Sequence, residues 1–266
     1  MSTGAARKRS PLTFFVLVFV LALPFWVLGA LVKPLPPINL SLSSLQIVCP
    51  VTTALILVYR EERLAGIRRL LKRVFDANKM KHHPIWYVPI LFLNPFILLL
   101  SYWIKLLLGH PIPQPFIPWS MIPFFFVVFF FSATCEEIGW TGYATDPLQE
   151  RWSALSTGLI IGSVWALWHI VGWKQEQPWA WVAGQCFLTI GLRVLMVWLY
   201  NNTSRSMFAV ILFHTMINVS EFSFPNYGSY FDPLLVGTIT AVLVVIVAFF
   251  WGPKTLARFR YASSYF

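Results

Sequence analysis

Long apolar runs recur along the chain and determine its architecture. A transmembrane helix needs roughly 20 mostly apolar residues to cross about 30 Å of hydrocarbon. The pattern predicts an all-α, polytopic membrane protein of about eight transmembrane helices, over residues 12–31, 42–59, 85–108, 119–135, 153–173, 179–199, 206–220 and 233–251. The fourth and seventh runs are short, so we expect their helices to continue into the polar residues beside them.

Composition supports a membrane protein and excludes other classes. Of the 266 residues 58% are apolar, 17% are aromatic and only 11% are charged. An ordinary soluble domain carries about 25% charged residues, so a soluble enzyme, a disordered chain and a secreted disulfide scaffold are excluded. Cys49, Cys135 and Cys186 show no paired spacing of a disulfide or zinc framework. Without repeats or long linkers, residues 1–266 are expected to form a single integral membrane domain.

Positive charges predict how the helices are oriented, because cytoplasmic loops carry an excess of Lys and Arg. Both termini, the segment 60–81, Arg151 and Arg205 together hold 16 of the 20 Lys and Arg residues. We therefore expect both termini to be cytoplasmic and the segment 60–81 to form a basic amphipathic helix on the cytoplasmic leaflet. Orientation and attraction to anionic membrane lipid explain the net charge of +10, so no nucleic-acid partner is expected.

A few ionisable residues interrupt the apolar runs. Each costs about 2.5–3.5 kcal/mol on insertion scales and therefore often marks function. Glu136 and Glu137 end the fourth run, and His169 lies in the fifth. Two adjacent carboxylates behind a wall of phenylalanine cannot both ionise without cost, which suits a general base. Taken singly, the glutamates could instead cap a helix end in headgroup water, and His169 could be a hydrogen-bonded packing residue.

His214 and Asn218 of the seventh run lie four residues apart and therefore share one helix face. Alone, this pair could serve helix-to-helix hydrogen bonding. The fourth and fifth runs should form an antiparallel hairpin in which Glu136 and His169 are equidistant from the turn and face one another. For these two to reach the depth of His214, the turn near Arg151 must project about two helical turns into the cytoplasm.

Taken in order, these residues resemble the motifs of the CPBP family of intramembrane proteases, which includes the type II CAAX prenyl endopeptidases and the Abi-type bacteriocin-immunity proteins. The family pattern is E-E-x-x-x-R, then F-x-x-x-H, then H-x-x-x-N or H-x-x-x-D, on successive helices of an eight-helix membrane fold. Glu136-Glu137, His169, and His214 with Asn218 match these motifs. The resemblance implies an intramembrane endopeptidase of a prokaryotic cell membrane, acting on a peptide or membrane-protein substrate.

Within the motif-bearing core, residues 120–220, the sequence departs from the family pattern twice. Thr141 stands where the family arginine is expected, and Trp165 replaces the phenylalanine. Without that arginine Glu137 needs another cation, because an unpaired buried carboxylate is costly. We expect Arg193 of the sixth run to take this place; the alternative is that its side chain reaches towards the membrane interface.

The resemblance and the residues together imply a mechanism. Glu136 and His169 would hold and deprotonate a water molecule that attacks a peptide carbonyl, while Glu137 would orient the groups around it. His214 and Asn218 would donate hydrogen bonds to the oxyanion that forms. No cofactor is favoured. The alternative is Zn²⁺ held by Glu136, His169 and His214, with one position open for water; the missing H-E-x-x-H helix weighs against it.

Two other classes of function compete with an endopeptidase whose cavity opens to the cytoplasm. A catalytically inactive binding or immunity protein is suggested by Thr141, because loss of a motif residue can accompany loss of activity. A transporter or channel would need polar residues at several depths, and the first three runs supply almost none. Cleavage of prenylated CAAX substrates is a family precedent only, and no motif specifies an oligomeric state.

Three further residues are assigned to the membrane interface. Glu221 continues the helix face of His214 and Asn218 and could therefore line the same cavity; the alternative, which we favour, is an exposed position near the far interface. Trp173 and Trp181 lie close to run ends, where the amphipathic indole ring anchors helices at headgroup level.

Overall fold

The computed structural model describes residues 9–32, 41–82, 84–110, 112 and 114–257, and in these ranges it contains helices and no strand. Seven of the described helical segments are long and apolar enough to span a membrane, and an eighth is apolar but shorter. The predicted all-α membrane fold is confirmed. The α-helices are α1 (Pro11–Leu31), α2 (Val48–Lys72), α3 (Tyr87–Leu107), α4 (Ile122–Gly139), α5 (Asp146–Gln149), α6 (Ala154–Glu176), α7 (Trp179–Asn202), α8 (Met207–Ser223) and α9 (Pro233–Trp251).

The two short apolar runs continue as helix, as predicted. A π-helical turn, Trp140–Thr145, joins α4 to α5 without a break, so that one helical rod extends from Ile122 to Gln149. Helix α8 extends three residues beyond the run that predicts it. The polar residues that follow both runs are thereby held on helix and not in loops.

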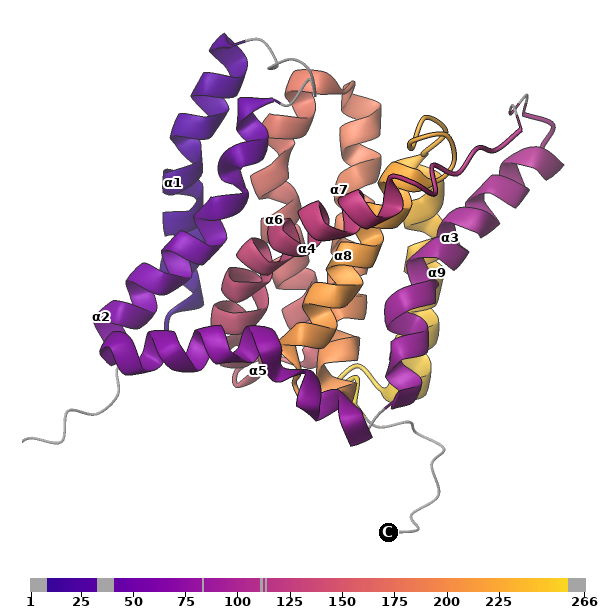
Figure 1. Cartoon of the computed structure of the whole chain (residues 1–266). Helices are drawn as coiled ribbons and strands as arrows, with labels where there is room; N and C mark the ends of the chain where they lie inside the picture. Colours follow the sequence, from indigo (N-terminus) through magenta and orange to yellow (C-terminus); the bar gives the residue numbers. More distant parts are fainter. Residues whose placement is uncertain (1–8, 33–40, 83, 111, 113, 258–266) are drawn as a thin grey trace, which may run out of the picture.

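Helix α2 changes direction at Arg63, which has non-helical dihedral angles of φ 57° and ψ −158°. Beyond this kink its basic half, with the 3-10 helical segment Arg73–His82, lies across one end of the bundle (Figure 1). Lys79 donates to the carbonyl oxygen of Arg205 from there. The segment 60–81 is helical as predicted, except at Arg63, Phe75 and Asp76, while its place on the cytoplasmic leaflet stays a prediction. We call this end of the molecule the basic end.

The turn after α5 lies level with the end of α7 and does not project beyond it. The Gln149 and Asn201 amides exchange hydrogen bonds, and Asp146 lies 3.6 Å from Arg205. The predicted projection is therefore wrong. Glu137 lies nine residues before Asp146, and His214 lies nine residues after Arg205. Because Asp146 and Arg205 are in contact, Glu137 and His214 lie at similar depth in the bundle.

Helices α6 and α7 approach closely because α6 presents glycine to its neighbour. A Cβ atom on Gly158 would lie 2.9 Å from the Cα of Val194, and one on Gly162 would lie 2.9 Å from the Cα of Ile190. Small residues four apart are a common means of bringing helix backbones together in membranes. The contact at Gly162 also holds Arg193 against α6, with 3.1 Å between that Cβ position and the arginine Cβ.

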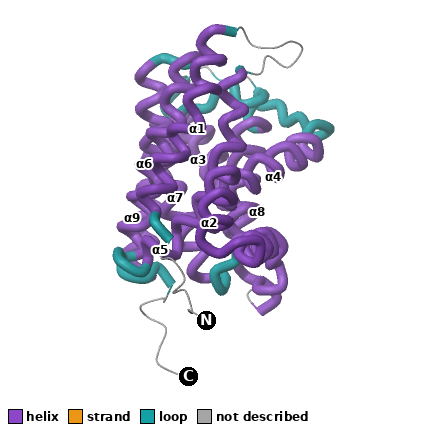
Figure 2. Tube along the Cα trace, turned by 90° about the vertical axis from the view of Figure 1, so that its left-hand side faces the viewer, coloured by secondary structure: helices purple, strands orange, loops and turns teal. Residues whose placement is uncertain are grey.

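Large apolar side chains cover the outward faces of the bundle, whose described loops gather at its two ends (Figure 2). Phe92 is 61% exposed, Val127 69% and Val245 67%. Such a surface is suited to lipid, and the chain is a multi-pass membrane protein. Residues 1–8 and 258–266, which carry most of the terminal charges, lie outside the described residues, so the cytoplasmic location of both termini stays a prediction.

Candidate functional site

Glu137 forms the centre of a fully buried ionic cluster between α4, α7 and α8. Its two carboxylate oxygens accept from the Arg193 guanidinium at 2.7 and 2.9 Å, and both side chains are 0% exposed. The Thr141 hydroxyl also donates to Glu137 from one turn along. Arg193 therefore pairs with Glu137 as predicted, and Thr141, at the family arginine position, contacts the same carboxylate.

Trp165 connects the ionic cluster to the neighbouring polar side chains. Its indole Nε1 donates to Glu136 Oε2 at 2.7 Å, and the Arg193 guanidinium lies 4.3 Å from the centre of its ring. The ring centroids of His169 and His214 lie 5.6 and 5.2 Å away, both edge to face. The hydrogen bond to Glu136 is one that phenylalanine cannot make.

The two histidines are held in the same manner. The Nδ1 of His214 lies 2.9 Å from Glu137 Oε1, and the Nδ1 of His169 lies 2.9 Å from the carbonyl oxygen of Trp165. Carboxylate and carbonyl oxygens only accept, so in both rings Nδ1 carries the proton. The Nε2 atoms on the opposite side of each ring remain for a ligand, since both residues line the same cavity.

This cavity has a volume of about 390 Å³ and lies between α6, α7 and α8. Glu136 and His214 are at its buried end, with 4% and 3% of their surfaces exposed. Each of the three helices contributes one stripe at helical spacing: 165, 169, 173 and 176 from α6; 181, 185, 189 and 192 from α7; 214, 218 and 221 from α8. The cavity therefore runs along the helices.

The cavity extends to the end of the bundle opposite the basic end. Glu176 at the end of α6 and Gln177 directly after it line the cavity, with Tyr227 and Gly228 of the α8–α9 loop. The expected opening of the cavity to the cytoplasm and the expected cytoplasmic position of the basic helix therefore exclude one another. The motif residues lie on the helices that the sequence predicts, but no sequence feature indicates which end of the bundle the cavity reaches.

The structure brings all five motif residues together but links them differently from the predicted pairing. Glu136, His169, His214 and Asn218 line the cavity, and Glu137 lies behind His214. The hydrogen bond that Glu136 makes among these side chains goes to Trp165, whose ring also contacts both histidines. No hydrogen bond among the described residues joins Glu136 to His169 directly, so their pairing stays a prediction.

For five residues of the cavity wall, the sequence either favoured another position or gave no indication of a role. Glu221 is partly buried and lines the cavity, so the exposed position that we favoured is wrong and the alternative is confirmed. Trp173 and Trp181, near the ends of α6 and α7, line the cavity as well. Gln185 and Thr189 were not singled out at all. Uncharged polar residues of α7 give no signal in the sequence until the facing helices are known.

Side chains that could ligate a metal ion are present, but they do not lie close together. Each histidine presents Nε2 with its Nδ1–H secured by an oxygen, which is the usual arrangement of a metal-ligating histidine. Even so, no three His, Cys, Asp or Glu side chains among the described residues lie close enough together to hold a metal ion. The proposed zinc ligands Glu136, His169 and His214 do not form a ready-made site.

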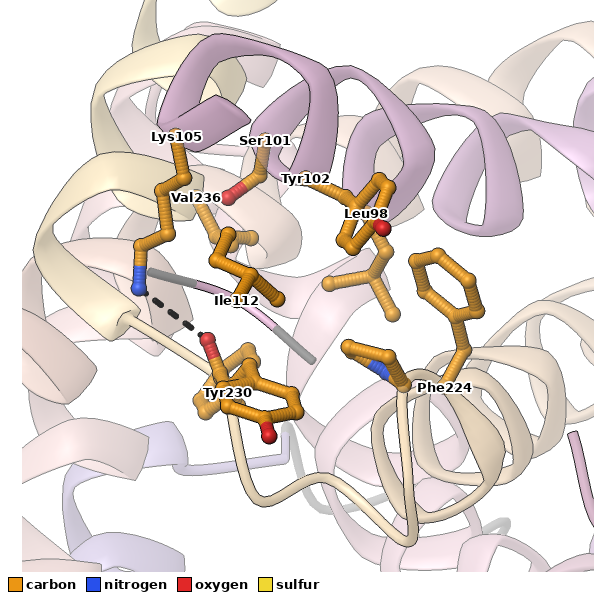
Figure 3. A pocket seen from close by; sticks show the side chains of 10 residues that line it. Leu98, Ser101, Tyr102, Lys105, Ile112, Phe224, Tyr230 and Val236 are labelled. Atoms are coloured by element: carbon orange, nitrogen blue, oxygen red, sulfur yellow. Dashed lines mark hydrogen bonds between the residues drawn. The ribbon is translucent and has the colours of Figure 1, made fainter. Parts of the chain in front are cut away.

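A second, smaller pocket lies apart from these residues, between α3 and the α8–α9 loop (Figure 3). Lys105 closes one side by donating to the carbonyl oxygen of Tyr230 at 3.1 Å. Its volume of about 10 Å³ is close to that of one water-sized sphere, and its described lining contains no carboxylate or histidine. It offers neither the space nor the chemistry of a substrate site.

Comparison with known proteins supports the resemblance. Residues 118–220 match the family model described as "Type II CAAX prenyl endopeptidase Rce1-like", and this segment contains every motif residue. The chain is also 25% identical over 236 residues to "CAAX prenyl protease 2" of the archaeon Methanococcus maripaludis, an alignment that covers 82% of this chain and 86% of the relative. Both findings confirm the similarity to this group and support a membrane-embedded protease.

Proposed function

We propose that this chain, given its similarity to the type II CAAX prenyl endopeptidases, is an intramembrane endopeptidase that activates water with Glu136 and His169. The observation that carries the proposal is the shared cavity. Glu136 and His169 both line it, and each has one atom available to a ligand, the second carboxylate oxygen and the ring Nε2. The substrate is a peptide or membrane-protein segment that enters this cavity.

In the proposed reaction a water molecule bridges Glu136 and His169. Its proton moves to Glu136, and its oxygen forms a bond to the substrate carbonyl carbon. The carbonyl oxygen then carries the negative charge. As the carbon–nitrogen bond breaks, the proton held by Glu136 passes to the departing amine, which restores the carboxylate.

His214 and Asn218 are proposed to stabilise the oxyanion. His214 Nδ1 is committed to Glu137, so donation by Nε2 requires that the ring carries both protons.

A metal-independent reaction fits the separated donors best. Zinc could be held only if Glu136, His169 and His214 moved together, so no step is derived through it. Incubation with a chelator should leave cleavage unchanged. Activity that is lost with the chelator and restored by zinc would instead favour the metalloprotease alternative.

The proposal is tested by incubating the purified protein with a panel of membrane peptides, including prenylated CAAX peptides, and identifying the products by mass spectrometry. His169→Ala should abolish cleavage. His110→Ala is the matched control, because this exposed loop histidine lies outside the cavity. Equal cleavage by parent and His169→Ala proteins would refute the assignment, and absence of cleavage across the panel would favour an inactive binding or immunity protein.

A further inference from the structure

The described wall of the cavity is acidic and aromatic, and the catalytic proposal leaves most of it without a role. Glu136, Glu176 and Glu221 line it, whereas no Lys or Arg does among the described residues. Negative potential in a cavity with low-dielectric walls is concentrated and attracts cations. The same cavity would repel a substrate that presented a carboxylate to it.

Glu221 is a carboxylate of this wall that lacks a stabilising partner among the described residues. It is partly buried on α8, and no hydrogen bond or ion pair from the described residues reaches it. A buried carboxylate without a partner is costly. A cationic group of a ligand would remove this cost when it bound.

Gln185 of α7 adds an independent sign of a missing ligand. It is 8% exposed and lines the cavity, yet its Oε1 has no hydrogen-bond partner. Gln185 precedes Arg193 by eight residues and Glu221 follows His214 by seven, on antiparallel neighbouring helices. The two acceptors are therefore at similar depth, about two helical turns from the ionic cluster.

Aromatic rings complete the surroundings that a cation would require. The ring of His169 stacks on Trp173 with 4.7 Å between centroids, and Trp173, Trp181 and Phe231 follow in edge-to-face contacts at 6.2 and 6.3 Å. All four line the cavity. Aromatic faces attract lysine and arginine head groups, more strongly where water is excluded.

We infer that this wall is a specificity site for a basic residue of the substrate, with Glu221 as its counter-ion. The inference rests on the proposed endopeptidase function and names its substrate class. Seven residues of helix between His214 and Glu221 rise about 10 Å, which is the length of about three residues of extended peptide. The basic residue therefore lies within about three positions of the bond that is cut.

The test uses three matched fluorogenic membrane peptides that differ only in carrying Lys, Gln or Glu near the scissile bond. Cleavage rate and binding are measured separately, binding through the fluorescence of the cavity tryptophans. We expect the Lys peptide to bind about tenfold or more tightly than the Gln peptide and the Glu peptide to bind least. Glu221→Gln should remove this preference, Glu221→Asp should retain it, and Glu150→Gln at the basic end should not change it.

The two readouts separate the specificity site from catalysis. Equal binding of all three peptides, no detectable binding, or a Lys preference that survives Glu221→Gln would each overturn the inference, even if cleavage occurs. A Lys preference that depends on Glu221 without cleavage of any peptide would keep the specificity site and refute the endopeptidase.

Discussion

Trp165 shows how one residue that departs from a family pattern can take on a polar role. The phenylalanine expected at this position would fill the same space, but the indole adds a donor that holds Glu136 at 2.7 Å. The same ring covers Arg193. Trp165 is therefore a positioning residue for the proposed general base.

Trp165→Phe tests this role, because it keeps the ring and removes the donor. A hydrogen bond to a charged group contributes about 1.5–3 kcal/mol, so we expect kcat to fall about 10- to 100-fold. KM for the same peptide should change less than about twofold. A fall in both kcat and thermal stability, or no change in kcat, would contradict a specific role for the indole N–H.

Arg193 is predicted to be essential for stability, because it is the cation that neutralises Glu137. Breaking a buried pair by removing one partner costs about 3–5 kcal/mol. Arg193→Leu should therefore lower the melting temperature in detergent markedly, whereas Arg151→Leu, at an exposed position, should not. The double variant Arg193→Leu/Glu137→Leu should recover much of the loss. If Arg193→Leu melts like the parent, the pair does not stabilise the fold.

Sequence reasoning at the residue scale succeeded where charge within an apolar run was itself the signal. Arg193 could be assigned to Glu137 because an unpaired intramembrane carboxylate requires a cation. Glu221 and Gln185 could not be placed in this way. Their exposure depends on how α7 and α8 rotate against each other, and one sequence does not specify that rotation.

At the scale of the elements, helix length and hydrophobicity predicted every described transmembrane segment. The exception was depth: the hairpin of α4 and α6 was treated as symmetric, whereas the α4 rod already ends at Gln149, level with Asn201. An error of one residue in where a turn begins changes the predicted depth of a side chain by about 1.5 Å along the helix axis. Such errors accumulate when a turn is placed from two distant residues.

Close packing of α6 against α7 predicts a difference between two glycines of α6. Gly162→Ala would put a Cβ 2.9 Å from the Cα of Ile190, so the helices must separate, at a cost of about 1–3 kcal/mol. Gly172→Ala meets no atom nearer than 3.4 Å and should be neutral or slightly stabilising. Melting curves of both variants test this; equal melting temperatures would mean that the contact at Gly162 is not tight.

At the scale of the whole molecule, the cavity mouth and the basic helix lie at opposite ends. If the basic end is cytoplasmic, as the charge distribution predicts, the substrate enters from the other side of the membrane. Entry from that side distinguishes the proposed reaction from one whose substrate enters from the cytoplasm. The sequence predicted orientation and active residues separately, and only the assembled helices show how the two relate.

Cysteine labelling in intact cells measures this arrangement. A membrane-impermeant maleimide should label Glu176→Cys at the mouth and should label Arg151→Cys only after permeabilisation; both positions are exposed. The parent protein is the control, because Cys49 and Cys135 are buried and Cys186 is partly buried. The reverse labelling pattern would place the mouth on the cytoplasmic side.

The account depends most on Glu136 as the base that activates water. Its most direct test is the cleavage rate of one membrane peptide by the parent, by Glu136→Gln and by Glu150→Gln, whose carboxylate lies at the other end of the molecule. General-base catalysis contributes about 10²–10⁴-fold, so Glu136→Gln should lose at least a hundredfold while Glu150→Gln matches the parent. A Glu136→Gln protein that folds, binds the peptide and cleaves it at the parent rate would contradict the account.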